Sequence, residues 1–150
     1  MEPGDQPSRG RFAGREHRYP VRVYFEDTDL SGVVYHANYL RFMERARSDM
    51  LCAAGIDQRA AWERGEGVYV VADLTIRYRQ PARLDDELLV VSKLVAWTAA
   101  SATIHQRVML MGEVLTEATV LAVFVAPNGG KPRRQPRPWL TIFEGLLEEN

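Results

Sequence analysis

The sequence is short of cysteine and of long apolar runs. Cys52 is the single cysteine among 150 residues and cannot form a disulfide within the chain, which favours a reducing compartment. We therefore expect a cytoplasmic protein. No run approaches the roughly 18 consecutive apolar residues of a membrane-spanning helix, and the first residues carry no apolar stretch of the kind a secretory signal needs. Neither a transmembrane segment nor secretion is expected.

Several kinds of ligand site are also missing. Gly129 and Gly130 lack the spacing of a P-loop or Rossmann phosphate loop and are interpreted as a turn. The 3 histidines have no metal-ligand spacing, so we predict no metal. A formal net charge of -1 argues against a nucleic-acid-binding surface over the domain.

Length and composition predict one domain with a tail. Residues 1–18 are rich in Gly, Pro and Arg and have Phe12 as their one large apolar group, which favours a mobile N-terminal tail. Residues 19–150 are expected to form a single domain. Within it, residues 127–138 are interpreted as a turn followed by a basic extended segment, and residues 139–150 as a short terminal helix.

Apolar side chains recur every three or four residues between positions 38 and 54, which predicts an amphipathic helix that ends at Gly55. On its polar side, the spacing of Arg45 and Asp49 permits a weak surface ion pair. A shorter helix is expected over residues 57–64.

The period changes to two after Gly67, where Leu74, Ile76 and Tyr78 alternate with polar residues before Pro81. Further strands are expected over residues 87–97, 101–111 and 114–126, in addition to one that precedes the long helix. The fold class is therefore α+β, with an antiparallel sheet of about five strands and one long helix packed on it.

The residues that suggest chemistry lie between positions 27 and 38. Asp27 and Asp29 occupy an acidic turn, Gly32 permits a tight bend, and His36 and Asn38 lie where the long helix should begin. A carboxylate beside the unpaired N–H groups of a helix start can act on a carbonyl carbon. Both aspartates could instead be turn formers, and His36 could be structural. Helix propensity makes Asn38 the N-cap and leaves His36 in the loop.

The same stretch carries a resemblance to a known family. Residues 24–29 read YFEDTD, residues 32–36 read GVVYH and residues 38–39 read NY, and similarity extends through ERAR at 44–47, PARLDD at 81–86 and KPR at 131–133. This pattern resembles the hotdog-fold acyl-CoA thioesterases, within the 4-hydroxybenzoyl-CoA thioesterase-like family and its YbgC-type, Tol-Pal-associated branch. The resemblance covers roughly residues 19–137.

That resemblance implies a fold, an activity and a set of site residues. In the hotdog fold a sheet wraps around one central helix, and two subunits pair sheet to sheet with active sites at their interface, as a homodimer or homotetramer. By position, Asp29 matches the catalytic carboxylate, either as general base or as nucleophile. His36 matches the functional histidine, and its backbone N–H matches the donor to the thioester oxygen. Support of the loop and of this oxyanion site would come from Tyr35, Gly32, Asn38 and Glu44.

The implied reaction is hydrolysis of a short or medium acyl-CoA to a free acid and coenzyme A, although an aromatic acyl group remains open. No cofactor is implied, because coenzyme A is part of the substrate. Its phosphates could be bound by the basic residues Lys131, Arg133 and Arg134, which could equally be a solvated surface segment. The alternative function is a non-catalytic hotdog module that binds acyl-CoA or acyl carrier protein, and acyl carrier protein is also a possible partner of the enzyme.

Overall fold

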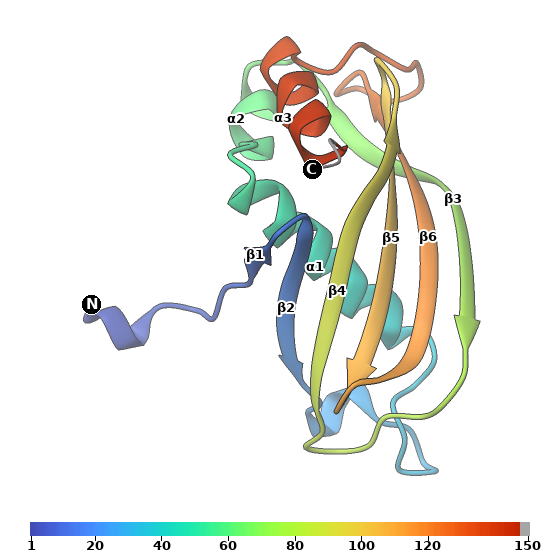
Figure 1. Ribbon diagram of the computed structural model, residues 1–150. Coiled ribbons are helices and arrows are strands. Elements are labelled where there is room, and N and C mark those ends of the chain that lie inside the picture. Colours follow the sequence, from blue (N-terminus) through green and yellow to red (C-terminus); the bar gives the residue numbers. More distant parts are fainter. Residues whose placement is uncertain (148–150) are drawn as a thin grey trace.

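In the computed structural model, which describes residues 1–147, an antiparallel sheet curves around one long helix (Figure 1). The described residues contain six strands in the order β1-β2-β4-β5-β6-β3. Their bounds are Arg11–Ala13 (β1), Glu16–Arg22 (β2), Val68–Tyr78 (β3), Glu87–Trp97 (β4), Ser101–Leu110 (β5) and Glu113–Val125 (β6). The helices are α1 (Asn38–Ala53), α2 (Gln58–Glu63) and α3 (Arg137–Leu147), with 3-10 turns at Pro3–Asp5 (η1) and Phe25–Asp27 (η2).

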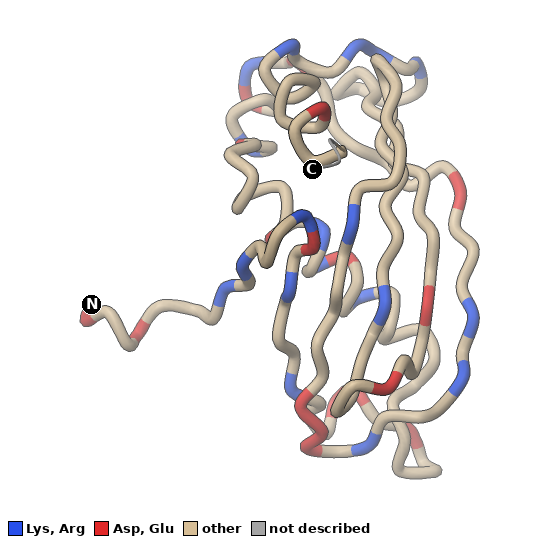
Figure 2. The backbone as a smooth tube through the Cα atoms, viewed as in Figure 1, with Lys and Arg blue, Asp and Glu red and all other residues tan. Residues whose placement is uncertain are grey.

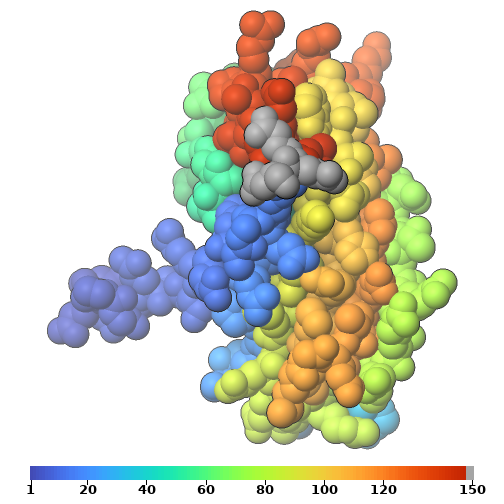
Figure 3. Space-filling model, viewed as in Figure 1, coloured from blue at the N-terminus to red at the C-terminus, as the bar shows by residue number. Residues whose placement is uncertain are grey.

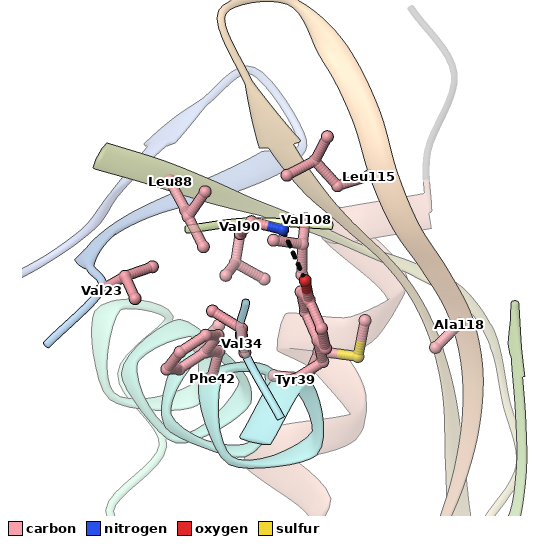
Figure 4. Packing of buried hydrophobic residues seen from close by; sticks show 12 residues of the cluster. Val23, Val34, Tyr39, Phe42, Leu88, Val90, Val108, Leu115 and Ala118 are labelled. Atoms are coloured by element: carbon pink, nitrogen blue, oxygen red, sulfur yellow. Dashed lines mark hydrogen bonds between the residues drawn. The ribbon is translucent and has the colours of Figure 1, made fainter. Parts of the chain in front are cut away.

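Helix α1 confirms the predicted amphipathic pattern. Its buried residues are Tyr39, Phe42, Met43, Ala46, Met50 and Leu51. The first four pack on the inner face of the sheet in a cluster with Val90 and Val108 (Figure 4), whereas Met50 and Leu51 belong to a second cluster with Leu94 and Ile104. The helix ends at the predicted place, where Gly55 adopts a φ of 93° that an L side chain rarely tolerates. One face of the sheet thus buries the helix, and the other carries mainly polar side chains.

The four strands predicted after the helix are all present, and α2 begins at Asp57, whose side chain caps the Ala60 N–H. Strand β6 lies between β5 and β3, in the interior of the sheet as its apolar run suggested. Strand β3 is at the edge of the sheet, and β1 adds a short sixth strand at the opposite edge that the sequence pattern did not reveal.

The predicted tail boundary at residue 18 is wrong. Strands β1 and β2 form a hairpin with Arg11 paired to Arg18, and β2 continues along β4. His17 is fully buried, and its Nε2 lies 2.7 Å from the Asp49 carboxylate on α1. The same oxygen of Asp49 accepts the Gly10 N–H at 2.9 Å. Hydrogen bonds between the buried His17, the partly buried Asp49 and the Gly10 backbone therefore hold this segment, and a count of apolar residues does not reveal them. The residues before the hairpin project from the domain (Figure 3).

Burial of His17 gives a testable pH dependence. Its Nδ1 is buried without a hydrogen-bond partner, and burial lowers the pKa of His17 below 6.5 in spite of Asp49. The unfolded chain then binds more protons than the folded chain, so we expect the free energy of unfolding to fall as the pH drops below 6.5. Urea unfolding between pH 7.5 and pH 5, at about half-unit steps, measures this loss. The slope should flatten in a His17→Gln variant, and an unchanged slope would contradict the assignment.

The carboxyl-terminal part crosses the end of the sheet that lies farthest from the start of α1 (Figure 1). Helix α3 confirms the predicted terminal helix up to Leu147 and buries Trp139 and Phe143, while residues 148–150 of that prediction lie outside the described residues. Over residues 1–147, no helix is long and apolar enough to cross a membrane.

Candidate active site

The acidic turn is held by Asp27. Its carboxylate accepts the Tyr24 N–H at 2.9 Å. Its backbone carbonyl accepts both the Tyr35 N–H and the side-chain amide of Asn38, each at 2.9 Å. Asp27 is therefore a turn former, as the simpler interpretation held, and Asn38 ties the start of α1 to this turn.

Asp29 lies two residues further along, in a tight loop closed by its own backbone. The Asp29 N–H donates to the Val33 carbonyl at 2.9 Å, and Gly32, at a φ of 82°, donates to the Asp29 carbonyl at 3.0 Å. The carboxylate accepts the Ser31 hydroxyl and the Ser31 N–H, the latter at 2.8 Å. These bonds, led by the hydroxyl, lower the pKa of Asp29 below 3.8. The side chain is thus an exposed, ionised carboxylate at neutral pH.

The start of α1 lies slightly away from both predicted positions, which made Asn38 the N-cap from helix propensity or placed the His36 N–H at the helix start from the family resemblance. Ala37 is the N-cap, Asn38 is the first helical residue, and His36 lies in the preceding turn, which the Asn38 N–H closes by donating to the Tyr35 carbonyl at 2.8 Å. Within residues 1–147, neither the His36 N–H nor the Ala37 N–H donates a hydrogen bond. Two free donors therefore lie at the positive end of α1, close in sequence to the Asp29 loop.

The His36 ring is exposed and lies between two tyrosine rings. Its centroid is 4.5 Å from that of Tyr35 and 6.2 Å from that of Tyr78, the latter in an edge-to-face arrangement. The Tyr78 hydroxyl also donates to the His36 backbone carbonyl at 2.9 Å. Alternation along the predicted strand grouped Tyr78 with Leu74 and Ile76, on the face opposite the polar residues. It could not predict this contact, which depends on where the strand ends relative to the turn.

A second set of contacts connects the turn to the core. The Val34 N–H donates to the Ala82 carbonyl at 2.8 Å, and the Ala82 N–H donates to the buried Tyr39 hydroxyl at 3.0 Å, the bond dashed in Figure 4. The segment before β4, the turn and the first turn of α1 therefore form one hydrogen-bonded unit.

Glu44 does not join this unit. Its side chain is exposed on α1 and makes no hydrogen bond within the described residues, so the structure does not place it at the loop. Glu44 and Arg47 form no ion pair within 4.0 Å among the described residues, and the Arg47 guanidinium donates to Gln106 at 2.9 Å. Glu44 instead lines a groove of about 110 Å³ between α1 and β3, and the residues that line it are Glu44, Arg47, Ser48, Leu51, Gln58, Tyr69, Val70, Val71, Ala102, Ile104 and Ala122.

The predicted phosphate-binding residues lie far from Asp29 in the same chain. Lys131, Arg133 and Arg134 are exposed, in a segment that folds back on the end of β6 through the Val125–Pro132 bridge, at the end of the sheet opposite the start of α1 (Figure 1). Lysine and arginine positions along the backbone are blue in Figure 2. The Arg133 guanidinium donates to the Gly65 and Glu66 carbonyls at 2.8 and 3.1 Å, so this side chain connects the basic segment to the loop that follows α2. Strands of this length span roughly 35 Å, so one chain does not bring this segment and Asp29 together.

No group of three or more His, Cys, Asp or Glu side chains that could hold a metal ion occurs within residues 1–147. The predicted absence of a metal and of a cofactor stays a prediction.

Comparison with known proteins identifies the family. Residues 23–141 match the Thioesterase-like superfamily, which covers most of the chain and all of the turn described above. The chain belongs to this superfamily. It is 41% identical over 128 residues to the acyl-CoA thioester hydrolase YbgC of Escherichia coli, a match that covers 85% of this chain and 95% of that protein.

Solved structures agree with this thioesterase-like assignment. A crystal structure described as a probable thioesterase from Bartonella henselae has 34% identity and a TM-score of 0.75, covering 81% of this chain and 99% of that one. The 1,4-dihydroxy-2-naphthoyl-CoA thioesterase of Synechocystis has a TM-score of 0.78 over 85% of this chain and 95% of its own, and at 24% identity it supports the fold alone. The hotdog fold predicted for this thioesterase-like chain is confirmed.

Proposed function

We propose that the chain is an acyl-CoA thioesterase that hydrolyses short or medium acyl-CoA to a free acid and coenzyme A. The observation that carries the proposal is the pairing, in one short segment, of the ionised Asp29 carboxylate with the unpaired N–H groups of His36 and Ala37. Membership of the thioesterase-like superfamily gives the reaction class, and the segment offers the base or nucleophile and the donors that the reaction needs.

Two routes use the same groups. As general base, Asp29 would take a proton from water while the water oxygen bonds to the acyl carbon, and the carbon–sulfur bond then breaks to release the thiolate of coenzyme A. As nucleophile, Asp29 would itself bond to the acyl carbon while the carbon–sulfur bond breaks and releases the thiolate of coenzyme A. Water would then hydrolyse the resulting anhydride to the free acid and regenerate the Asp29 carboxylate. In both routes the carbonyl oxygen becomes negative, and the N–H groups at positions 36 and 37 would stabilise it. The His36 side chain would orient water or the leaving thiolate.

The groove between α1 and β3 does not adjoin Asp29 within one chain, because its apolar lining lies beside Leu51, about 20 Å along α1 from the helix start. It adjoins the inner face of β3 and is lined by Val70, Val71, Leu51 and Ile104, beside the polar Arg47.

We further propose that the chain acts as a homodimer, and that two such dimers could associate into a tetramer. Strand β3 runs for 11 residues at the edge of the sheet, with Val71 52% exposed and no strand on its outer side among the described residues. A long apolar edge is a template for pairing with another chain, so a second copy of β3 is the proposed partner. Pairing there would also cover the groove between α1 and β3, and it is the route by which a partner's basic segment could approach Asp29.

A lysine on this edge should weaken the dimer. Val71→Lys places one positive charge from each copy in the proposed interface, and we expect the dissociation constant to rise at least about tenfold, because like charges facing each other are costly. Sedimentation equilibrium measures the change. Val95→Lys is the matched control, since Val95 is also exposed, at 45%, but lies on the interior strand β4. Equal dissociation constants for wild type and Val71→Lys would contradict pairing through β3.

The proposed activity is tested by thiol release from a panel of acyl-CoAs that varies in chain length and includes an aromatic member. The proposal predicts turnover that is greatest for short or medium chains. Binding of acyl-CoA without thiol release across the whole panel would favour the alternative of a binding module, and the same panel presented on acyl carrier protein tests that partner. A cytoplasmic location is part of this proposal, and fractionation of cells that express the chain would check it.

A further inference from the structure

In the turn before α1, the His36 backbone carbonyl accepts a hydrogen bond from the side chain of a distant strand. Tyr78 is the last residue of β3 and lies on its inner face, where its hydroxyl donates to the His36 backbone carbonyl at 2.9 Å. Its ring packs edge to face against His36 and Tyr39, with centroid separations of 6.2 and 5.6 Å. This contact joins the edge strand to the turn across 42 residues of sequence.

The accepting carbonyl determines where the next N–H points. In a trans peptide, the C=O of His36 and the N–H of Ala37 lie in one plane and point in opposite directions. A hydrogen bond that holds the carbonyl therefore holds the N–H as well, and polarises it into a stronger donor. The preceding peptide is held in the same way, because the Tyr35 carbonyl accepts the Asn38 N–H at 2.8 Å. Both free N–H groups thus belong to peptides whose carbonyls are bonded.

The two peptides differ in what holds them. The first is held by the local turn, whereas the second depends on Tyr78 alone among the described residues. Burial raises the pKa of Tyr78 above 10, so its hydroxyl keeps its proton and remains a donor at neutral and mildly alkaline pH.

We infer that Tyr78 is a positioning residue for the thioesterase reaction, which orients and polarises the Ala37 N–H toward the developing oxyanion through its hydrogen bond to the His36 carbonyl. The inference rests on the proposed function, since it assigns a role to a residue that touches the turn rather than the substrate. It adds to the site a group from the edge strand, 49 residues after Asp29.

The test is Tyr78→Phe, which removes one hydroxyl and keeps the ring. We expect kcat for acyl-CoA hydrolysis to fall about tenfold with KM within about twofold of wild type, because the oxyanion forms only in the transition state. The matched control is Tyr19→Phe. Tyr19 lies on β2, near the edge of the sheet opposite β3, and its hydroxyl makes no hydrogen bond within the described residues. Loss of that hydroxyl should leave kcat and KM unchanged. Urea unfolding of both variants confirms that each is folded.

A readout that does not need turnover separates this inference from the proposed function. In an amide NMR spectrum, Tyr78→Phe should move the Ala37 N–H resonance upfield, because the His36 carbonyl of the same peptide loses its hydrogen-bond donor. Tyr19→Phe should leave this resonance where it is. If wild type releases no thiol, the proposed function fails, and the Ala37 shift still reports on the contact. A folded Tyr78→Phe with wild-type kcat, or with raised KM and unchanged kcat, overturns the positioning role, as does an unmoved Ala37 resonance.

Discussion

Replacing Asp29 by asparagine is expected to lower kcat for acyl-CoA hydrolysis by about a thousandfold, because the amide neither accepts a proton from water nor forms an acyl intermediate. Asparagine keeps an oxygen that can accept the Ser31 hydroxyl and N–H, so the loop should keep its shape. The side chain is exposed, and its substitution should leave the free energy of unfolding nearly unchanged. Steady-state thiol release with wild type and variant measures the loss.

Asp27→Asn is the matched control for that experiment. It makes the same chemical change two residues away, on a carboxylate whose described role is to accept the Tyr24 N–H. We expect kcat to stay within about threefold of wild type, because an amide oxygen can replace that acceptor. Hydrolysis that survives Asp29→Asn, or a larger loss for Asp27→Asn, would remove Asp29 from the mechanism.

Replacing Asp49 by alanine is expected to lower the free energy of unfolding by about 3 kcal/mol, because two donors lose their acceptor and each unpaired buried donor costs roughly 1–3 kcal/mol. The donors are the fully buried His17 ring and the Gly10 N–H. Gly10 is closely packed in the hairpin, since a Cβ there would lie 2.4 Å from the Arg18 carbonyl oxygen. Urea unfolding at pH 7.5 measures the change.

Arg45→Ala distinguishes the buried contact from a surface one. The i,i+4 spacing suggested that Asp49 pairs with Arg45, yet the structure turns the Asp49 carboxylate to His17 and Gly10 instead. Loss of Arg45 should therefore change the free energy of unfolding by less than about 0.5 kcal/mol. If Arg45→Ala and Asp49→Ala destabilise the chain equally, the stabilising partner of Asp49 is Arg45 and the description of the hairpin is wrong.

The elements that periodicity predicted are those whose burial is decided by apolar side chains. Helix α1 was predicted to within one residue, because its apolar stripe has to face the sheet. Strands β4, β5 and β6 were predicted for the same reason, with boundaries set by turns at 98–100 and 111–112. The N-terminal hairpin was missed because His17, Asp49 and the Gly10 backbone hold it through hydrogen bonds, which leave no apolar pattern.

The same distinction between local pattern and distant contacts applies to the residues of the candidate site. The local sequence was enough to place Asp29, Gly32, His36 and Asn38 in one short segment that ends at the start of α1, because residues this close in sequence remain near one another in any compact arrangement. It was not enough to predict the contact of Tyr78, which reaches the turn only because β3 ends beside it. Nor did it predict that Glu44 lies outside the loop, or that the basic segment at 131–134 lies at the other end of the sheet from Asp29 (Figure 1).

By itself the sequence determined the α+β class, the apolar face of the central helix and the acidic turn, since each depends on side-chain pattern within one segment. The tertiary structure alone decided which strand lies free at the edge, which carbonyl each distant side chain reaches, and which N–H groups remain unpaired at the helix start. Such contacts follow from the positions of segments tens of residues apart, and the packing of the whole core sets those positions.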